Sequence, residues 1–342
     1  SWLKWLPAIG LGFLVLAPLL LALTSPVVQQ RFQETSILVN LEPVERSNEL
    51  RAASGNTLWS RVVYHRYVFW AELLANNYLK HLSPQFLFGT GDANPRHLSQ
   101  FLAALYPWEA LTILLGVMFS KHWFKRSRDF WLLVGLTLTS PIAAMLTTAT
   151  PHALRALPLS VWLAGWSGLG TAFLLETLQQ QWSIMSKKLR YIQPIARYIP
   201  SLFFVFSLIC WGFLWVFFRY QYRVEFANEW QYGYQQLVQA VNHHQQPDET
   251  VYISRYAGRP AMYFFFYNQV DPRAVQAAND EAKQDQQELL EFGSWQFVDR
   301  QPSQPGLYAI PADAPLPDEA TSLDTISDLE GKKVWILYRI ES

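Results

Sequence analysis

The chain has 342 residues, 51% of them hydrophobic and 16% charged, and its 27 basic and 27 acidic side chains cancel to a net charge of zero. The charge is unevenly spread, because residues 1–218 carry 17 basic and 9 acidic side chains whereas residues 219–342 carry 10 and 18. Long uncharged runs, of the length that crosses a bilayer core of roughly 30 Å, lie only in the first part. They exclude a single soluble globule, and the composition excludes collagen, a coiled coil and general disorder.

Five membrane spans are predicted where the charges vanish, at residues 5–24, 101–120, 130–146, 156–175 and 198–218. The first run is long enough to span and lacks a small-residue cleavage site, so it is interpreted as a span and not as a signal peptide. The predicted fold is an α-helical polytopic membrane protein, with a transmembrane domain at 1–218 and a small extracytoplasmic α/β domain at 219–342. Because a span follows Ser1 almost at once, the chain is expected to be a piece of a longer protein.

The orientation of the spans follows from the basic residues of two short loops, since Lys and Arg stay on the cytoplasmic side. The long loop 25–100, the turn 147–155 and the closing domain are then outside, and the protein is expected in the plasma or inner membrane. The two basic loops contain Lys121, Lys125, Arg126 and Arg128, and Lys187, Lys188, Arg190 and Arg197.

Within the long outer loop, apolar residues between Arg61 and Leu82 recur every three or four positions, which is typical of an amphipathic helix. We interpret it as a helix along the membrane surface, with Trp70, Leu74 and Tyr78 on one apolar side. The alternative is a helix packed on the outer domain, and the pattern alone does not distinguish the two surfaces.

The closing domain is predicted to contain both helices and strands. Helices are expected at 225–244 and 273–291, and strands at 250–254, 295–298, 306–310 and 333–340, with the prolines between 302 and 317 in loops. Residues 251–254 and 334–338 are expected in one sheet, in a domain that folds independently of the spans.

Two outer loops contain the side chains best suited to chemistry. In residues 83–97, SPQFLFGTGDANPRH, glycines and a proline impose tight turns around Asp92, Arg96 and His97. Arg suits bidentate phosphate binding, His can donate or accept a proton near neutral pH, and Asp can bind a cation or orient either one. A divalent metal ion is thus the one cofactor that the sequence leaves open. The alternative is a surface loop in which Arg96 and Asp92 pair and His97 is merely exposed.

The second loop is TTATPHALR at 147–155, where His152 and Arg155 are the only ionisable side chains between residues 131 and 175. Ionisable groups at membrane depth are expensive and often functional, although Arg155 could instead snorkel to lipid headgroups while His152 caps the turn. Two loops that each offer an Arg and a His could jointly receive a phosphate. Glu109, one turn inside the second span, could hold a basic residue of either loop or lie in the headgroup region.

Other features support no separate chemistry. His243 and His244 have no Cys, Asp or Glu at ligand spacing and are interpreted as a solvated helix end. The single Cys210 lies in an apolar run, and several of the 15 tryptophans lie at span ends, as in an aromatic belt. Motifs for nucleotide, hydride-transfer, zinc-peptidase and serine-hydrolase sites are absent, and the acidic closing domain has no basic footprint for nucleic acid.

At the two outer loops the sequence resembles a known family. The runs NNYLKHLSPQFLFGTGDANPRH, LYPWEALTILLGV and SPIAAMLTTATPHALRALP are similar to the second half of bacterial membrane glycosyltransferases of the C superfamily, closest to the protein O-mannosyltransferase and aminoarabinose transferase group. The resemblance covers residues 5–218. The closing domain, with GRPAMYFFFYNQVDP, is similar to outer domains that end some members.

The resemblance implies an enzyme that takes a sugar from a polyprenyl-phosphate carrier and passes it to a protein or lipid acceptor on the outer face. Family members have further spans and an acidic first outer loop before the matching region, so the chain is expected to be the C-terminal part of such an enzyme, without the catalytic carboxylate. No residue is assigned as catalytic. Arg96 and Arg155 are expected as phosphate ligands, with His97 and His152 as polar partners.

Two other functions remain open from the sequence. One is a membrane-anchored binding module whose acidic outer domain recognises a partner while the spans only hold it in place. The other is a transporter, against which no matching pair of Gly/Pro-broken spans is found.

Overall fold

The computed structural model describes residues 6–186, 198–256, 258–281, 284–285, 288–300 and 303–341. The chain forms two compact units, Ser1–Cys210 and Trp211–Ser342, and each is described by itself. The division lies inside helix α11 (Ile199–Val216), eight residues before the predicted domain boundary at 218/219.

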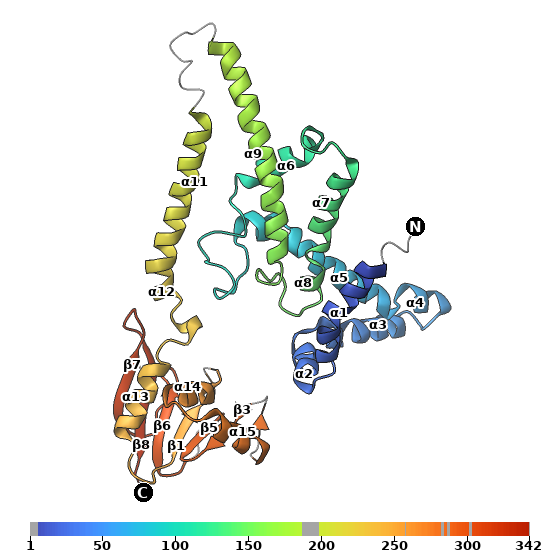
Figure 1. The fold of residues 1–342 in the computed structure, drawn as a ribbon. Helices are drawn as coiled ribbons and strands as arrows, with labels where there is room; N and C mark the ends of the chain where they lie inside the picture. Colours follow the sequence, from blue (N-terminus) through green and yellow to red (C-terminus); the bar gives the residue numbers. More distant parts are fainter. Residues whose placement is uncertain are drawn as a thin grey trace. The chain divides into compact units, whose positions relative to one another are not determined.

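The first unit is helical. In Figure 1, α6 and α7 lie beside the long helix α9, and the contacts between these helices agree with the view. Its elements are α1 (Leu6–Ala22), α2 (Pro26–Thr35), η2 (Ile37–Val39), α3 (Glu42–Ala53), α4 (Leu58–Val63), α5 (Arg66–Leu82), η3 (Gln85–Gly89), α6 (Glu109–Met118), η4 (Ser120–His122), α7 (Ser127–Thr139), α8 (Ile142–Met145) and α9 (Leu157–Ser186).

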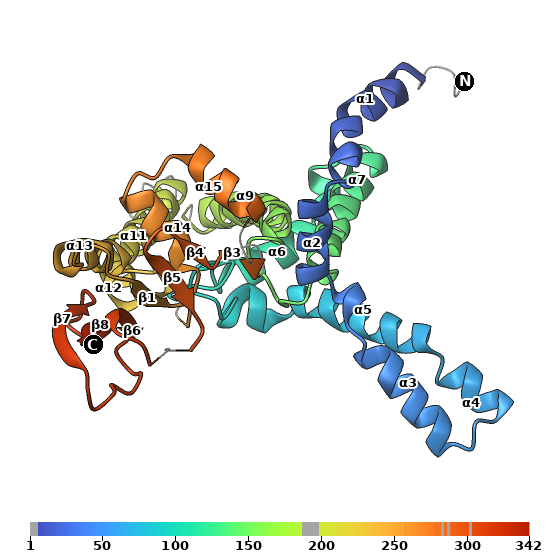
Figure 2. The same ribbon diagram turned by 90° about the horizontal axis from the view of Figure 1, so that it is seen from below.

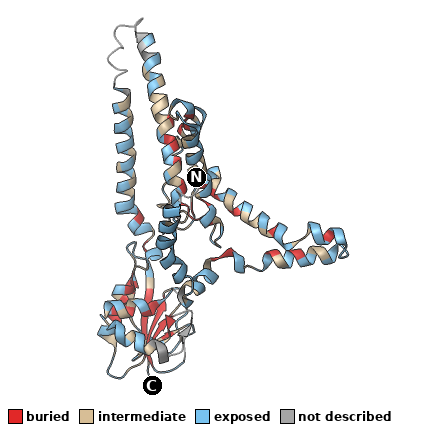
Figure 3. Cartoon of the chain, turned by 45° about the vertical axis from the view of Figure 1, so that its right-hand side comes forward, coloured by how far each residue is buried: buried red, intermediate tan, exposed pale blue. Residues whose placement is uncertain are grey.

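Two helices are long and apolar enough to cross a membrane: Leu157–Gln181 within α9, and Pro200–Glu225, which includes α11. None of the most apolar stretch of the second is buried in the protein, and Figure 3 shows α11 exposed along its length. Two more apolar helices, Gly10–Ala22 and Glu109–Met118, are shorter. Two of the five predicted spans therefore have the required length and composition, and the other three stay predictions. The basic loop containing Lys187 and Arg197 lies outside the described residues.

The predicted second span, 101–120, is not one continuous helix. Only Glu109–Met118 is helical, about 15 Å at 1.5 Å per residue, which is half the thickness of a bilayer core. Just before the helix, residues 106–109 form a turn in which the Glu109 carboxylate accepts a hydrogen bond from Tyr106 N at 2.8 Å. The preceding segment is tied to another loop, since Leu105 N donates to Leu87 O at 2.9 Å.

The predicted amphipathic helix is present as α4 and α5, which are separated at Tyr64 and His65. The buried side of α5 faces α7 and α8, because Tyr78 Oη donates to Leu138 O at 2.7 Å and Asn77 Nδ2 donates to Met145 O at 3.3 Å. Near its start α5 lies beside α3 (Figure 2). The helix is confirmed, and its position along a membrane surface stays a prediction.

The second unit is an α/β domain built on a six-stranded sheet with the order β4-β5-β1-β6-β8-β7. β1 pairs in parallel with β5 and β6, and β4, β8 and β7 are antiparallel to their neighbours. The elements after α11 are η5 (Phe217–Gln221), α12 (Tyr222–Glu225), η6 (Asn228–Trp230), α13 (Tyr234–His244), β1 (Val251–Ser254), α14 (Pro260–Tyr267), α15 (Pro272–Glu281), β2 (Gln284–Asp285), β3 (Glu288–Leu289), β4 (Glu291–Phe292), β5 (Trp295–Val298), β6 (Gly306–Pro311), β7 (Thr321–Ser327) and β8 (Lys333–Ile340).

Both faces of this sheet carry buried side chains. Alternate residues of a strand point to opposite faces, so each strand contributes to both. One face packs with α13 and α14 around Leu237, Ile253 and Phe264. On the other face Tyr252, Tyr308 and Tyr338 stack in a row. The central strands are accordingly the buried part of this unit in Figure 3.

The predicted strands are confirmed as β1, β5, β6 and β8, and β1 and β8 belong to one sheet. Two helix predictions were too long. The helix expected at 225–244 begins at Tyr234, after the left-handed backbone of Gln231 (φ 59°) and Gly233 (φ 102°). The helix expected at 273–291 ends at Glu281, and among the later residues that the structure describes, 284–285 pair with 288–289, and 291–292 join the sheet beside β5. Helix α14 and strands β2, β3, β4 and β7 were not predicted.

A bidentate ion pair closes the end of this domain. Arg339 Nε lies 2.7 Å from Glu249 Oε1, and Arg339 Nη2 lies 3.1 Å from Glu249 Oε2. Burial opposes the charge on Glu249, but the hydrogen bonds from Arg339 and Gln246 outweigh it, and the pKa of Glu249 is lowered. The stability that this pair contributes is present above the pKa of an unfolded Glu, about 4.3, and is lost as pH falls through the folded pKa.

We expect Arg339→Ala to destabilise the domain by about 3 kcal/mol at neutral pH, because the largely buried Glu249 carboxylate loses its opposite charge. The difference in the free energy of unfolding between the variant and the wild type should shrink as Glu249 becomes protonated at low pH. Calorimetric unfolding between pH 7 and pH 3 measures it, with the exposed Arg300→Ala as the control. A difference in stability that does not change with pH would contradict a stabilising ion pair between Arg339 and Glu249.

Candidate functional site

The loop that follows α5 holds Asp92 between turns. Gly91 has a positive φ of 72°, and a Cβ there would overlap Leu98, so this position requires glycine. Asp92 is 4% exposed, and its Oδ1 accepts a hydrogen bond from Asn94 N at 2.9 Å. Its Oδ2 accepts one from Ala153 N at 2.8 Å, across 61 residues. Asp92 therefore joins the two outer loops that the sequence singled out.

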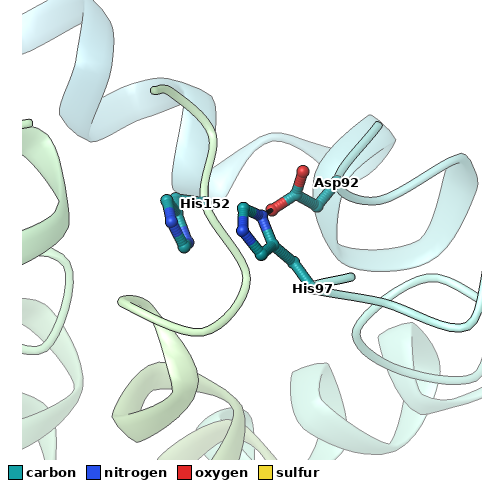
Figure 4. Close-up of side chains that lie close together, drawn as sticks. All are labelled: Asp92, His97 and His152. Carbon is teal, nitrogen blue, oxygen red and sulfur yellow. Dashed lines mark hydrogen bonds and ion pairs between the residues drawn. The ribbon is translucent and has the colours of Figure 1, made fainter. Parts of the chain in front are cut away.

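Two histidines meet beside this carboxylate. His97 Nδ1 lies 2.8 Å from Asp92 Oδ2, and the rings of His97 and His152 stack with centroids 3.9 Å apart and planes 19° apart. Figure 4 shows the three side chains together, from the two separate loops. One potential ligand atom from each of them lies within 4.8 Å of the others. These are residue types that bind metal ions.

A third histidine, His81, positions the second loop. It is fully buried at the end of α5, and its Nδ1 lies 2.8 Å from Asn77 O, so Nδ1 carries the proton. The other ring nitrogen, Nε2, therefore accepts the hydrogen bond from His152 N at 3.1 Å. His81 was missed as a site residue. In the sequence, His81 follows Asn77 by four residues, so both lie on the same face of the helix, and both belong to the run that carries the family resemblance. That position was the only signal that could have identified His81.

The charges of the cluster follow from burial and hydrogen bonding. Burial would raise the pKa of Asp92, but hydrogen bonds from Ala153, Asn94 and His97 outweigh it, and the pKa is lowered. Burial, with smaller contributions from Arg155 and His97, lowers the pKa of His152 to about 4. Burial also lowers the pKa of His81. At neutral pH the site therefore contains an anionic Asp92 and neutral His81 and His152.

Two polar atoms on the second loop are left unsatisfied. Within the described part of the chain, His152 Nδ1 and Arg155 Nη1 are buried and have no hydrogen-bond partner. Burial and the charge of Arg31 lower the pKa of Arg155. Buried polar atoms in proteins are nearly always paired, so these two atoms are available to a bound group.

The structure brings together three of the six predicted site residues, Asp92, His97 and His152, with Arg155 next to His152 in the same loop. Arg96 is exposed, and its backbone N donates to Asn94 Oδ1 at 3.0 Å. The expectation that Arg96 and Arg155 bind the same phosphate stays a prediction. Glu109 is the first residue of α6, and its carboxylate accepts a hydrogen bond from Tyr106 N.

The sites of the two units differ in character. A cavity of about 690 Å³ in the second unit is lined mainly by apolar side chains of α14 and α15, with Arg259 and Glu288 among its polar groups. The Glu288 carboxylate is already held by Arg255 Nε at 2.9 Å and by Ala261 N at 3.2 Å. His243 and His244 lie at the end of α13, where His244 Nε2 is 3.9 Å from Asp324 Oδ2.

Comparisons with known proteins find no matching family model, no similar curated protein and no similar solved structure.

Proposed function

We propose that this chain is part of an integral membrane glycosyltransferase, which takes a sugar from a polyprenyl-phosphate carrier and passes it to a protein or lipid acceptor on the outer face of the membrane. The observation that carries the proposal is the meeting of two loops, 92–97 and 152–155, around side chains suited to a phosphate. The resemblance of the same two loops to membrane glycosyltransferases supports the choice of carrier.

Arg155 is the principal phosphate ligand in this proposal. Its Nη1 is buried and unpaired, and a guanidinium binds phosphate with two parallel hydrogen bonds. His152, which is neutral, faces the same phosphate as an uncharged group or through a bound cation. Asp92 fixes the loop through Ala153 N and keeps these groups in place. Arg96, at the exposed edge, is a second phosphate ligand.

The membrane part of the proposal is supported by composition. Leu157–Gln181 and Pro200–Glu225 are assigned as spans, and the exposed apolar side chains on the second suit lipid, among them Phe204, Trp211 and Phe213. The proposed topology is completed by the other three predicted spans, by the outer position of residues 147–155 and by an extracytoplasmic domain after Arg219. Of these spans, 101–120 contains a helix of only about 15 Å. The turn that carries His152 and Arg155 then lies at the membrane surface, where a carrier phosphate is found.

A divalent metal ion is the proposed cofactor. A carrier phosphate is anionic, and a cation beside it would neutralise charge that develops on the phosphate when the sugar leaves.

Lipid binding tests the function. The chain is reconstituted in nanodiscs of zwitterionic lipid, and binding of a short polyprenyl phosphate and of the matching polyprenol is compared by native mass spectrometry. We expect the phosphate to bind at least about tenfold more tightly, because charge-assisted hydrogen bonds contribute about 1.5–3 kcal/mol each. Equal binding of the two lipids would overturn the proposal.

A second function, an anchored binding module, is favoured by one observation. The cavity of about 690 Å³ between α14 and α15 falls in the size range of small-molecule sites, roughly 300–1,000 Å³. A module of this kind would bind its ligand in the second unit and would not need His152 or Arg155. Loss of polyprenyl-phosphate binding in His152 and Arg155 variants would therefore argue for the transferase and against the module.

A further inference from the structure

We propose that Asp92, His97 and His152 bind one transition-metal ion of the Zn²⁺ type. The inference deepens the proposed function by giving its metal ion a place and a class. It rests on that function only for what the ion does, and not for whether the ion binds.

The set of ligands indicates the class of ion. Imidazole nitrogens suit Zn²⁺, Fe²⁺, Co²⁺ and Ni²⁺, whereas Mg²⁺ and Ca²⁺ prefer a shell of oxygen atoms. Two histidines and one carboxylate therefore select a borderline transition-metal ion. Three protein ligands also leave a coordination position open, as in catalytic zinc sites and unlike closed structural ones. In the proposed enzyme a phosphate oxygen would take that position.

The geometry is close to that of a bound site. Ligand atoms about 2.1 Å from a tetrahedral Zn²⁺ ion are about 3.4 Å from one another, and the ligand atoms of the cluster lie within 4.8 Å of one another. A movement of about an ångström would bring them around one ion. The stacked rings of His97 and His152 would tilt apart, so that both nitrogen lone pairs point at the ion.

His152 supplies the second observation. It is 7% exposed, and its Nδ1 is buried with no hydrogen-bond partner among the described residues. Its backbone is fixed, because His152 N donates to His81 Nε2. A buried ring nitrogen without a partner beside a second histidine and a carboxylate is the arrangement that a metal ion would satisfy.

Coordination requires both bonded atoms, Asp92 Oδ2 and His97 Nδ1, to be free of a proton. Asp92 Oδ2 and His97 Nδ1 now share a hydrogen bond, and on metal binding both atoms become ligands. A neutral His97 then carries its proton on Nε2, and an imidazolium His97 releases one proton to solvent. Ala153 N and Asn94 N continue to donate to the Asp92 carboxylate, because each carboxylate oxygen has two lone pairs. These backbone donors orient the ligand, as second-shell groups do in known metal sites.

The test uses the whole chain, without a polyhistidine tag, in nanodiscs free of sugar donor and carrier. The chain is stripped with a chelator and titrated with Zn²⁺ in competition with a chromophoric chelator, and the bound metal is counted by elemental mass spectrometry. We expect one Zn²⁺ per chain, and excess Mg²⁺ should not displace it. Replacement by Co²⁺ should give the visible absorption of a site with nitrogen ligands.

Three variants and a matched control decide the location. His152→Ala, Asp92→Asn and His97→Gln should each weaken Zn²⁺ binding at least about 100-fold, since loss of an outer partner alone costs 10–100-fold. His97 is the most exposed of the three residues, so His97→Gln keeps the test valid if a buried variant unfolds. The control, His243→Ala with His244→Ala, should bind as the wild type does.

Unchanged Zn²⁺ binding in His97→Gln, or loss of binding in the control, would overturn the metal site. Displacement of Zn²⁺ by Mg²⁺ would overturn the class of ion. Because no carrier is present, failure here is separate from failure of polyprenyl-phosphate binding, which tests the transferase.

Discussion

Replacing Gly170 by alanine is expected to separate α6 from α9 and to destabilise the first unit by at least about 3 kcal/mol. A Cβ at Gly170 would overlap the carbonyl oxygen of Thr112, and one at Gly116 would overlap that of Trp166. The clashes involve backbone, which cannot rotate away, so the cost lies at or beyond the roughly 1–3 kcal/mol of ordinary overpacking. Separation would also break the buried hydrogen bond between Thr112 Oγ1 and Ser167 Oγ, now 2.7 Å.

The same helix provides the control. Gly168 is two residues away, and a Cβ there meets nothing within 4 Å. Gly168→Ala should therefore leave stability unchanged or raise it by up to about 1 kcal/mol, because alanine favours a helix more than glycine does. Calorimetric unfolding of both variants in nanodiscs measures the difference. Equal stability of the two variants would show that α6 and α9 are not in close contact.

Close packing of α6 and α9 also bears on the site. Trp166 and Leu159 of α9 form one buried core with Phe86 and Leu87, which lie just before Asp92 in the chain. Small residues let two helices approach closely in a membrane, where packing replaces the hydrophobic effect as the driving force. We infer that Gly116 and Gly170 hold the base on which the two loops rest.

Replacing Arg155 by lysine is expected to weaken polyprenyl-phosphate binding by about 10–100-fold, although the charge is kept. Lysine cannot form the two parallel hydrogen bonds of a guanidinium with phosphate, and a hydrogen bond to a charged group contributes about 1.5–3 kcal/mol. Binding of the matching polyprenol should not change, because that lipid has no phosphate and binds only through its hydrocarbon part.

The alternative for Arg155 predicts the opposite result. An arginine that only snorkels to lipid headgroups can be replaced by lysine, which snorkels equally well. Arg128→Lys is the matched control, because Arg128 is exposed and its Nε lies 3.7 Å from Asp129 Oδ1. Wild-type phosphate binding by Arg155→Lys would favour snorkelling, and equal losses in both variants would show a general effect of replacing arginine by lysine that is not specific to Arg155.

In the second unit, local pattern correctly predicted four of the eight strands in the described residues. β1, β5, β6 and β8 are short runs rich in β-branched and aromatic residues, and this signal does not depend on distant contacts. The sequence failed where distant pairing decides the conformation. Residues 291–292 form a strand because β5 lies beside them, and the helix predicted through them ignored that partner.

In the first unit, composition located the apolar runs but not the helix ends. The stretch 101–120, whose only charge is Glu109, has the length of a span, yet its helix begins only at Glu109. The segment before the helix makes other hydrogen bonds, since Tyr106 N donates to the Glu109 carboxylate and Leu105 N donates to Leu87 O. Hydropathy reports the transfer free energy of side chains, and it contains no information about which backbone groups find partners elsewhere.

The sequence by itself determined the candidate chemistry of the site, because ionisable residues in apolar surroundings stand out by type: Asp92 and His97 in one loop, His152 and Arg155 in the other. Only the tertiary structure decided which of them meet. The bonds that join the loops connect Asp92 to Ala153 and His81 to His152, across 61 and 71 residues. Helical and strand periodicity describe neighbours within a few residues, whereas these contacts depend on how α5, α8 and α9 pack, and that packing also turned His81 into a positioning residue.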